Sequence, residues 1–377
     1  MSADAPHILH VFSTFVPAGP ELRFVRLANA AGVEFRHSIL AIDGRTDAAA
    51  LLSPELDARV LEPLPRAGTP ATVRRLTRLM DELQPDLCCS YNFGAFDAVI
   101  AARLSGRRAI LHHEDGFNAD EAQRFKRRRE WLRRAFLPGV QRVIVPSAVL
   151  ERIARERWHL APELVELIPN GIDCASFAAR DGNAELRTQL GIPAGAFVVG
   201  FVGHLRPVKR PERLLAACAA LDQALDVHVL MLGDGAERAA LERESAGGPL
   251  AGRVHLVGHI DDPRAHYRAM DAFALVSDSE QMPVALLEAL GSGLPVVATD
   301  VGDVRGILPD VQAEHCHALG ASVVQDLTRS LAALARDPEE RGRLGAANLT
   351  RVREQYDFGT MLSAHLAQWR RAAGVQA

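Results

Sequence analysis

The chain has 377 residues, 48% of them hydrophobic and 24% charged, so it can form a large apolar core and is long enough for two domains. Its formal net charge of −4 argues against a general nucleic-acid binder. The N-terminus lacks a basic region followed by a long apolar core, and no apolar run reaches the roughly 20 residues that span a bilayer. We therefore expect a cytoplasmic protein. Five scattered cysteines without a Cys-x-x-Cys pair fit buried thiols in a reducing compartment.

The first half of the chain alternates segments typical of strands with segments typical of helices. The expected strands are 7–12, 37–42, 86–90, 109–113, 142–147 and 164–169. Helical periodicity lies between several of them, for example at 71–83 and 95–104. This alternation predicts an α/β domain with a parallel, doubly wound sheet.

The pattern loosens at 176–196, where turn-forming residues cluster, and we place an inter-domain linker there. Beyond it, strands are expected at 197–203, 227–233, 253–258, 272–277 and 295–299. The predicted domains are thus Rossmann-like units over 1–175 and 197–357. Ligands of such sheets bind beyond the carboxyl ends of the strands, so we expect a cleft between those ends of both sheets.

The segment 277–302 carries the strongest functional pattern. Pro283 stands where a helix would begin, because its missing N–H group would be unpaired there in any case. Gly291 and Gly293 suit the end of that helix, and the apolar run 295–299 reads as a buried parallel strand. The helix start is a natural seat for an anion such as pyrophosphate.

Two carboxylates flank this helix start. Glu280 and Glu288 are eight residues apart, and on a helix that separation is roughly 12 Å. They are therefore too far apart to act as an acid/base pair, but they can grip the two ends of an elongated ligand. Carboxylates accept hydrogen bonds from sugar hydroxyls. A ligand with hydroxyl groups at both ends and an anion in the middle is a nucleotide sugar.

Glu-x7-Glu followed by LEALGSGLPVVATDVG resembles the motif of retaining glycosyltransferases of family four (glycosyl transferases group 1). That family has the GT-B architecture, in which two Rossmann-like domains face each other across a cleft. The resemblance implies that Glu280 contacts the donor sugar, that Glu288 holds the ribose hydroxyls, and that a last helix at about 358–377 completes the N-terminal domain. The backbone that would support the sugar and phosphate is that of Gln281, Met282, Pro283 and Val284.

A basic loop at 203–215 follows the first strand of the second half. Cations there can neutralise a diphosphate leaving group. The loop resembles the family's Gly-Arg-Leu…Lys element, to which Gly203 and Lys209 correspond, but His204 stands where arginine is expected. Either His204 serves as a weaker, pH-dependent donor, or Arg206 takes the role. We favour Arg206 with Lys209.

Two further glycines are expected beside the donor. Gly19 lies in the loop 17–23 after the first strand, where the family usually has a Gly-Gly pair. Gly233 begins a Gly-Asp-Gly sequence after another strand, and the family has a similar Gly-x-Gly that lines the nucleotide pocket. Glycine allows a ligand to approach the backbone closely.

Titratable residues end the expected strand 109–113. The family has a catalytic-site histidine here, which His112 or His113 would supply. Adjacent strand residues point to opposite faces, so at most one of the two faces the cleft. Asp115, just before Gly116, is the third candidate for that place.

The segment 124–136 interleaves seven cations with aromatic and apolar residues. Such a helix can bind an anionic membrane surface. Alternatively, Phe125, Trp131, Leu132, Ala135 and Phe136 pack it on its sheet and leave a solvated cationic face. A peripheral association with the inner face of the membrane therefore stays open.

The sequence as a whole predicts a glycosyltransferase (EC 2.4) that moves a sugar from a nucleotide-sugar donor to a glycan or lipid-linked acceptor in the biosynthesis of cell-surface polysaccharide, lipopolysaccharide or glycolipid. A sugar-nucleotide epimerase of the same fold and a degenerate, non-catalytic binding subunit are the alternatives. We expect no cofactor and no nucleic-acid partner. We also expect no metal, because the spacing in Glu314–His317 does not converge on one ion.

Overall fold

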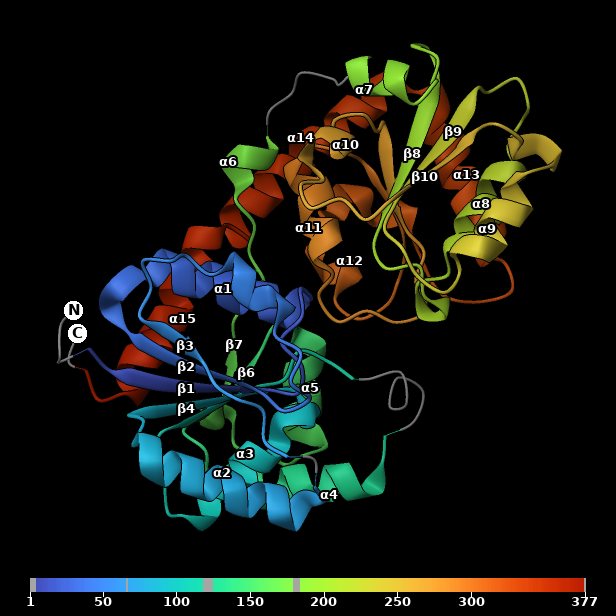
Figure 1. Ribbon diagram of the computed structural model, residues 1–377. Coiled ribbons are helices and arrows are strands. Elements are labelled where there is room, and N and C mark those ends of the chain that lie inside the picture. The colour runs from blue at the N-terminus through green and yellow to red at the C-terminus, as the bar shows by residue number, and fades with distance from the viewer. Residues whose placement is uncertain (1–4, 66, 118–124, 179–183, 376–377) are drawn as a thin grey trace. The chain divides into compact units, whose positions relative to one another are not determined.

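The computed structural model describes residues 5–65, 67–117, 125–178 and 184–375. The chain divides into two compact units: Met1–Asn170 with Met361–Ala377, called unit 1, and Gly171–Thr360, called unit 2. Each unit has one parallel sheet flanked by helices (Figure 1). The predicted α/β class with two Rossmann-like sheets is confirmed. Among the described helices, none is long and apolar enough to cross a membrane.

Unit 1 is built on seven parallel strands in the order β3-β2-β1-β4-β5-β6-β7. The strands are β1 (His7–Phe12), β2 (Arg36–Ala41), β3 (Ala58–Val60), β4 (Leu87–Tyr91), β5 (Ile110–His113), β6 (Arg142–Val145) and β7 (Val165–Leu167). The helices are α1 (Gly19–Ala31), α2 (Thr69–Leu83), α3 (Phe96–Leu104), α4 (Arg127–Phe136), α5 (Ala148–Glu156) and the greater part of α15 (Phe358–Ala372). The strand order reverses between β1 and β4, and ligands of such sheets bind beside that reversal.

The last helix of the chain completes the core of unit 1. Trp369 of α15 is fully buried, with its ring 5.6 Å from that of His10 and 5.5 Å from that of Phe35. In Figure 1, α1 and α15 lie on one face of this sheet, and α2, α3 and α4 lie on the other. The central strands β1, β4 and β5 are buried along their whole length, as in a parallel sheet that helices cover on both faces.

Unit 2 has six parallel strands in the order β10-β9-β8-β11-β12-β13. The strands are β8 (Phe197–Val202), β9 (Val227–Leu232), β10 (Val254–Gly258), β11 (Ala272–Leu275), β12 (Val296–Thr299) and β13 (Cys316–His317). The helices are α6 (Cys174–Phe177), α7 (Ala184–Gln189), α8 (Pro211–Ala219), α9 (Arg238–Ser245), α10 (Arg264–Tyr267), α11 (Val284–Gly291), α12 (Val304–Ile307), α13 (Val323–Arg336) and α14 (Pro338–Gln355).

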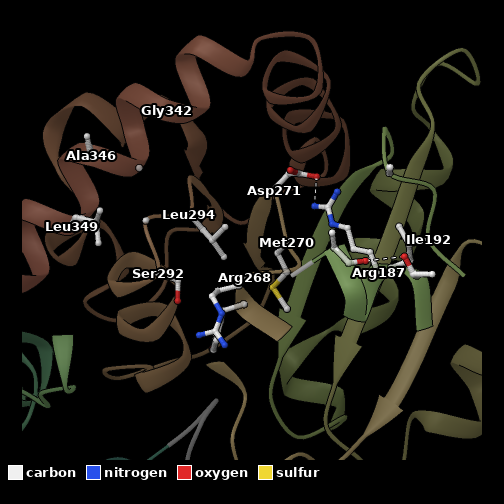
Figure 2. Close-up of a pocket in the computed structure, with 16 residues that line it drawn as sticks. Arg187, Ile192, Arg268, Met270, Asp271, Ser292, Leu294, Gly342, Ala346 and Leu349 are labelled. Carbon is white, nitrogen blue, oxygen red and sulfur yellow. Dashed lines mark hydrogen bonds and ion pairs between the residues drawn. The ribbon is translucent and has the colours of Figure 1, made fainter. Parts of the chain in front are cut away.

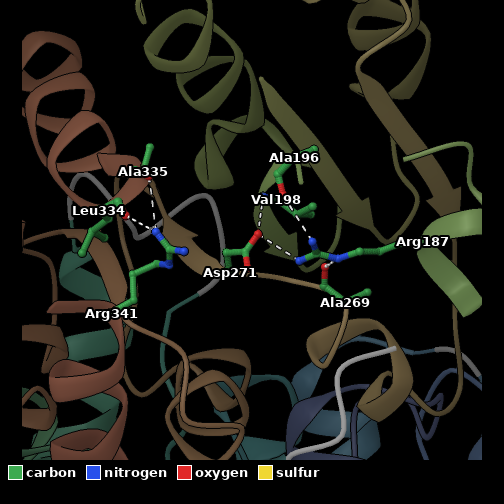
Figure 3. Close-up of polar contacts among 8 residues, drawn as sticks. All are labelled: Arg187, Ala196, Val198, Ala269, Asp271, Leu334, Ala335 and Arg341. Carbon is green, nitrogen blue, oxygen red and sulfur yellow. Dashed lines mark hydrogen bonds and ion pairs between the residues drawn. The ribbon is translucent and has the colours of Figure 1, made fainter. Parts of the chain in front are cut away.

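The described part of the segment expected as a linker, 176–178 and 184–196, lies within unit 2; residues 179–183 fall outside the described residues. Arg187 of α7 donates hydrogen bonds to the carbonyl oxygens of Ala269 (2.9 Å) and Ala196 (3.2 Å) and to the carboxylate of Asp271 (2.9 Å). Asp271 also accepts the backbone N–H of Val198 at 2.8 Å (Figure 3). One guanidinium thus attaches α7 to the start of β8 and to the start of β11.

Candidate donor site

Glu280 and Lys209 form an ion pair in unit 2. The Lys209 ammonium lies 2.6 Å and 2.8 Å from the two carboxylate oxygens of Glu280. The Ser277 hydroxyl donates to Glu280 Oε1 at 2.6 Å, and Thr299 of β12 donates to the Ser277 carbonyl oxygen at 2.7 Å. Glu280 is only 9% exposed. The loop after β11 and the loop after β8 are therefore joined by charge at the carboxyl edge of the sheet.

Helix α11 begins directly after this loop. Pro283 is its N-cap, with ψ 118°, so the helix starts at Val284 and not at the proline. The cause is the extended backbone of Pro283, which leaves it just outside the first turn. Gly293 has φ +71° and ends the helix, as expected. Gly291 is instead the last helical residue, and a Cβ there would lie 2.5 Å from Ile172 Cδ1, so it is required for packing.

Glu288 lies on α11 and is held by Tyr267. The Tyr267 hydroxyl is 2.9 Å from Glu288 Oε2, and 3.2 Å from the carbonyl oxygen of Ala285. Burial, with the neighbouring Glu288 charge, raises the pKa of Tyr267 well above its ordinary value. The hydroxyl therefore stays protonated and can donate to the carboxylate. Sequence reasoning missed Tyr267, because a single tyrosine outside the 277–302 segment carries no spacing signal.

The backbone of the Glu280 loop packs closely on Gly302. A Cβ at Gly302, which has φ +56°, would lie 2.1 Å from the carbonyl oxygen of Glu280. The backbone N–H of Asp303 donates to the carbonyl oxygen of Gln281 at 3.2 Å. Met282 is buried and Val284 is half-buried. The end of the 277–302 motif therefore sets the shape of the loop that carries its first glutamate.

The glycines after β8 and β9 approach each other. A Cβ at Gly233, with φ +126°, would lie 2.0 Å from the carbonyl oxygen of Gly203. A Cβ at Gly235 would lie 2.4 Å from the carbonyl oxygen of Leu205. Backbone bonds join the two loops, from Leu205 N–H to Asp234 O at 2.9 Å for example. Close approach of backbone to backbone is thus a sufficient reason for these glycines.

His204 and Arg206 are both exposed in the loop after β8. Partial burial of the ring, together with the charges of Arg206 and Lys209, lowers the pKa of His204. The imidazole is therefore largely neutral at pH 7 and is a poor cation for a diphosphate. Within the described residues the Arg206 guanidinium has no ion pair, so its charge is available to a ligand.

In unit 1, His112 and His113 lie on opposite faces of β5, as the strand geometry predicts. His112 shares a 2.8 Å hydrogen bond with Ser90 and lies 3.6 Å from Glu114. The ring of His113 stacks on Tyr91 at 4.6 Å and on His365 of α15 at 5.6 Å. Both histidines are almost fully buried. They are parts of the core of unit 1 in this structure.

Asp115 is placed differently, because it lies beyond the end of β5 and pairs with Arg23 of α1. The two groups form a bidentate ion pair, with Arg23 Nη2 and Asp115 Oδ2 at 2.9 Å. Arg23 also donates to the side-chain oxygen of Asn170 at 3.1 Å. Gly19 opens α1, and a Cβ there would meet open space. Sequence reasoning did not connect Arg23 or Asn170 with Asp115, because both residues are far from Asp115 in the chain.

Glu21 is a buried carboxyl group in the first turn of α1. Burial raises its pKa to about 7, and the neighbouring Asp115 charge adds to the effect. Near neutral pH this group therefore exchanges a proton readily, which suits a general base or acid. Sequence reasoning missed it, because burial of a charged residue at a helix start leaves no pattern.

The basic helix α4 agrees with the packing expectation only in part: Leu132 and Phe136 pack against the core of unit 1, but Trp131 and Ala135 do not. Arg133 is fully buried, where it donates to Glu114 at 3.0 Å and lies over the Trp158 ring at 4.9 Å. Trp131 is 64% exposed, and Ala135 is exposed beside it. The physical reason is the buried charge of Glu114, which requires a cation in the place that an apolar residue was expected to fill. Arg124 lies outside the described residues.

A pocket of about 610 Å³ lies at the other edge of the unit 2 sheet. It is lined by residues that precede strands, such as Met270 before β11 and Leu294 before β12, and by α14 (Figure 2). Glu280 and Lys209 follow strands and so lie at the opposite edge. The pocket is therefore not the expected donor site.

Two family models match the chain. The model described as Glycosyltransferase Family 4 matches residues 6–176, and the model described as Glycosyl transferases group 1 matches residues 182–351. A D-inositol 3-phosphate glycosyltransferase of Kineococcus radiotolerans is 33% identical over 233 residues, which is 56% of this chain and 52% of that protein. An Escherichia coli UDP-Gal:alpha-D-GlcNAc-diphosphoundecaprenol alpha-1,3-galactosyltransferase is 30% identical over 209 residues, 54% of each chain.

The chain thus spans about half the length of these curated relatives. Among solved structures, Anabaena HepE in complex with UDP has a TM-score of 0.82 at 20% identity, covering 97% of this chain and 100% of that one. This likeness shows the fold. Two family models match, one on each half of the chain, and the Glu-x7-Glu segment is intact. The chain therefore belongs to the family-four glycosyltransferases, group 1, and has the GT-B fold.

Proposed function

We propose that this protein is a retaining glycosyltransferase that moves a sugar from a nucleotide-sugar donor to a glycan or lipid-linked acceptor. The observation that carries the proposal is the arrangement in unit 2, where Glu280, paired with Lys209, precedes the start of α11 and Glu288 lies on the same helix. A uridine diphosphate sugar is the first donor to test, because one relative is named for UDP-galactose and one structural neighbour was solved with UDP.

The two glutamates would hold the two ends of the donor. Glu280 Oε1 already accepts from both Lys209 and Ser277, whereas Oε2 accepts only from Lys209 and keeps acceptor capacity for a sugar hydroxyl. Glu288 is fixed by Tyr267 and is half-buried, so its carboxylate can accept the ribose hydroxyls. The backbone of 281–284 would lie along the sugar and the phosphates.

Arg206 would carry most of the charge that neutralises the diphosphate. The charge of Lys209 is already balanced by Glu280, whereas Arg206 has no such partner within the described residues. Stabilising the charge that develops on a leaving group is the largest electrostatic demand of such a reaction. Lys209 would contribute through the third N–H group of its ammonium, which the two contacts with Glu280 leave over.

The reaction itself would break the bond between the anomeric carbon and the diphosphate oxygen and form a bond from the same face to the acceptor oxygen. The proton of the acceptor hydroxyl would pass to the departing diphosphate. We assign to the acceptor side Asp115, which lies beyond the end of β5, and Glu21, whose pKa is raised to about 7.

The acceptor would belong to the biosynthesis of a cell-surface polysaccharide, lipopolysaccharide or glycolipid. One relative is named for an acceptor that is linked to diphosphoundecaprenol. A membrane-bound acceptor would suit the exposed face of α4, which carries Arg127, Arg128 and Arg134 around the exposed Trp131. We propose that this face binds the anionic inner surface of the membrane.

A thermal-shift screen against UDP-, GDP-, ADP- and TDP-sugars tests the donor. A ligand that binds only the folded state raises the unfolding temperature, and the shift should disappear in Glu288→Ala. Incubation of the protein with the donor that shifts its unfolding temperature and with a membrane extract then tests transfer. Release of nucleotide diphosphate only when acceptor is present supports the transferase. Conversion of the nucleotide sugar without acceptor would identify an epimerase, and binding without turnover would identify a non-catalytic subunit.

A further inference from the structure

We propose that Glu314, His315 and Glu340 of unit 2 form a binding site for a divalent transition-metal ion, with Zn²⁺ as the leading candidate. One ligand atom from each residue lies within 4.8 Å of the other two. Three ligands at tetrahedral positions around Zn²⁺ are about 3.4 Å apart, given metal–ligand distances of about 2.1 Å. Small side-chain rotations therefore suffice to bring the three atoms onto one ion.

The histidine supplies evidence that is independent of the two carboxylates. His315 is only 5% exposed, and neither of its ring nitrogens has a hydrogen-bond partner among the described residues. A buried polar atom without a partner is unfavourable and rare in folded proteins. A metal ion would bind the nitrogen lone pair and remove that deficit.

The three residues come from two elements that the fold already holds together. Glu314 and His315 end the 3-10 helix at Asp310–His315, just before β13, and Glu340 lies in the first turn of α14. Gln312 of the 3-10 helix donates to Asn348 of α14 at 3.0 Å and accepts the backbone N–H of Val296 at 2.8 Å. The metal would add a second connection between α14 and the short edge strand β13.

The guanidinium of Arg343 already forms an ion pair with the carboxylate of Glu340. Arg343 donates to both oxygens of Glu340 at 2.6 Å, one turn along α14. The Arg343 side chain is half-exposed, so it can turn into solvent when an ion binds. Arg343 and the metal would therefore compete for Glu340, and removing the guanidinium should strengthen metal binding.

The ligand set selects among ions. One imidazole nitrogen with two carboxylates suits Zn²⁺, Co²⁺ and Ni²⁺, whereas Mg²⁺ and Ca²⁺ prefer oxygen ligands alone. The sequence did not predict this site, because only the residues within 314–317 were considered together as ligands. Glu340 lies on a separate helix. The site is remote in the chain from Glu280 and Glu288 and does not depend on the proposed transferase reaction.

The test uses tag-free, full-length protein that has been treated with a chelator and then titrated with Zn²⁺ by calorimetry. We expect one equivalent to bind. Glu340→Gln should weaken the affinity by about tenfold or more, because even outer-sphere changes cost that much at such sites. Glu339→Gln, next in the chain and exposed, is the matched control and should leave the affinity unchanged. Arg343→Gln should tighten binding.

Co²⁺ provides a second readout through its visible absorption, which should appear with the parent protein and be lost with His315→Gln. If His315→Gln fails to fold, Glu340→Gln and Arg343→Gln still decide, because both changes lie at the surface of α14. An absence of stoichiometric binding by the parent would overturn the proposal. So would equal affinity in the parent and Glu340→Gln, which would assign the ion to other histidines.

Discussion

The ammonium of Lys209 and the carboxylate of Glu280 neutralise each other at 2.6 Å and 2.8 Å, across two loops of unit 2. This pair lies where the resemblance to family four implies two separate ligand contacts. In the structure each group is also the counter-ion of the other. Removal of either group therefore leaves the charge of its partner unpaired.

We therefore expect Lys209→Met and Glu280→Gln each to lower the free energy of unfolding by about 1–3 kcal/mol, since each leaves a poorly solvated group unpaired. The double variant should lose less than the sum of the two single variants. Urea unfolding of all four proteins measures this coupling. Additive losses would mean that the pair is not formed in solution.

Tyr267 positions Glu288, and its removal should act on the donor through that carboxylate. Tyr267→Phe keeps the buried ring and deletes only the hydroxyl, so we expect the affinity for UDP to fall by about three- to tenfold, the effect of one hydrogen bond. Glu288→Ala should abolish binding. Calorimetric titration with UDP compares them, and an unchanged affinity in Tyr267→Phe would show that Glu288 is oriented without it.

Arg206 and His204 are the two candidates for binding the diphosphate, and their variants should differ in activity. The lowered pKa of His204 leaves it neutral at pH 7, so Arg206→Ala should reduce kcat/KM far more than His204→Ala. The matched change Arg206→Lys keeps the charge and should retain part of the activity. The reverse order of the two alanine variants would return the phosphate role to His204.

The exposed face of α4 should bind anionic vesicles. Arg127→Gln, Arg128→Gln and Arg134→Gln together should reduce co-sedimentation with phosphatidylglycerol vesicles, and binding by the parent should weaken as salt is added. The control replaces Arg152, Arg243 and Arg336, which are exposed elsewhere, with glutamine and removes the same charge. Equal binding by both triple variants would argue against a specific surface.

Unit 1 should lose stability as the pH falls below about 6.5. Burial lowers the pKa of His37 to about 4 and also lowers the pKa of His365, which is enclosed beside His113. A histidine that stays neutral when folded but takes up a proton when unfolded favours the unfolded state in acid. At pH 5.5 each such group reduces the free energy of unfolding by about 1.4 kcal/mol relative to pH 7.5.

The variant His365→Phe tests that effect, because it keeps an aromatic ring beside His113 and cannot be protonated. We expect its free energy of unfolding to fall by about 1.4 kcal/mol less than that of the parent between pH 7.5 and pH 5.5. Urea unfolding at the two pH values measures the difference. Equal losses in the two proteins would mean that His365 is protonated in the folded state.

The sequence predicted the long strands because a strand buried on both faces must be mostly apolar, as β1 and β9 are apart from their histidines. It did not predict β3 and β13, which have three and two residues and lie at sheet edges, where no apolar run is required. Both strands are found only through their neighbours, β2 and β12.

Site residues divide in the same way. Glu280, Glu288 and Lys209 stand in a recognisable segment, but their partners Ser277 and Tyr267 become evident only from the contacts. The orientation of α4 could not be predicted either. An apolar pattern assigns Trp131 to the core, whereas the buried charge of Glu114 brings Arg133 there instead. Electrostatic partners that lie on separate elements leave no spacing in the chain.

The burial of Trp369 against His10 and Phe35 has a consequence for synthesis on the ribosome. Unit 1 begins at the first residues of the chain, yet its core closes only when the last helix has been made. Unit 2, which is continuous, can finish folding while unit 1 still lacks α15. A chain that stops before α15 would therefore keep almost all of unit 2 but would leave the core of unit 1 without Trp369.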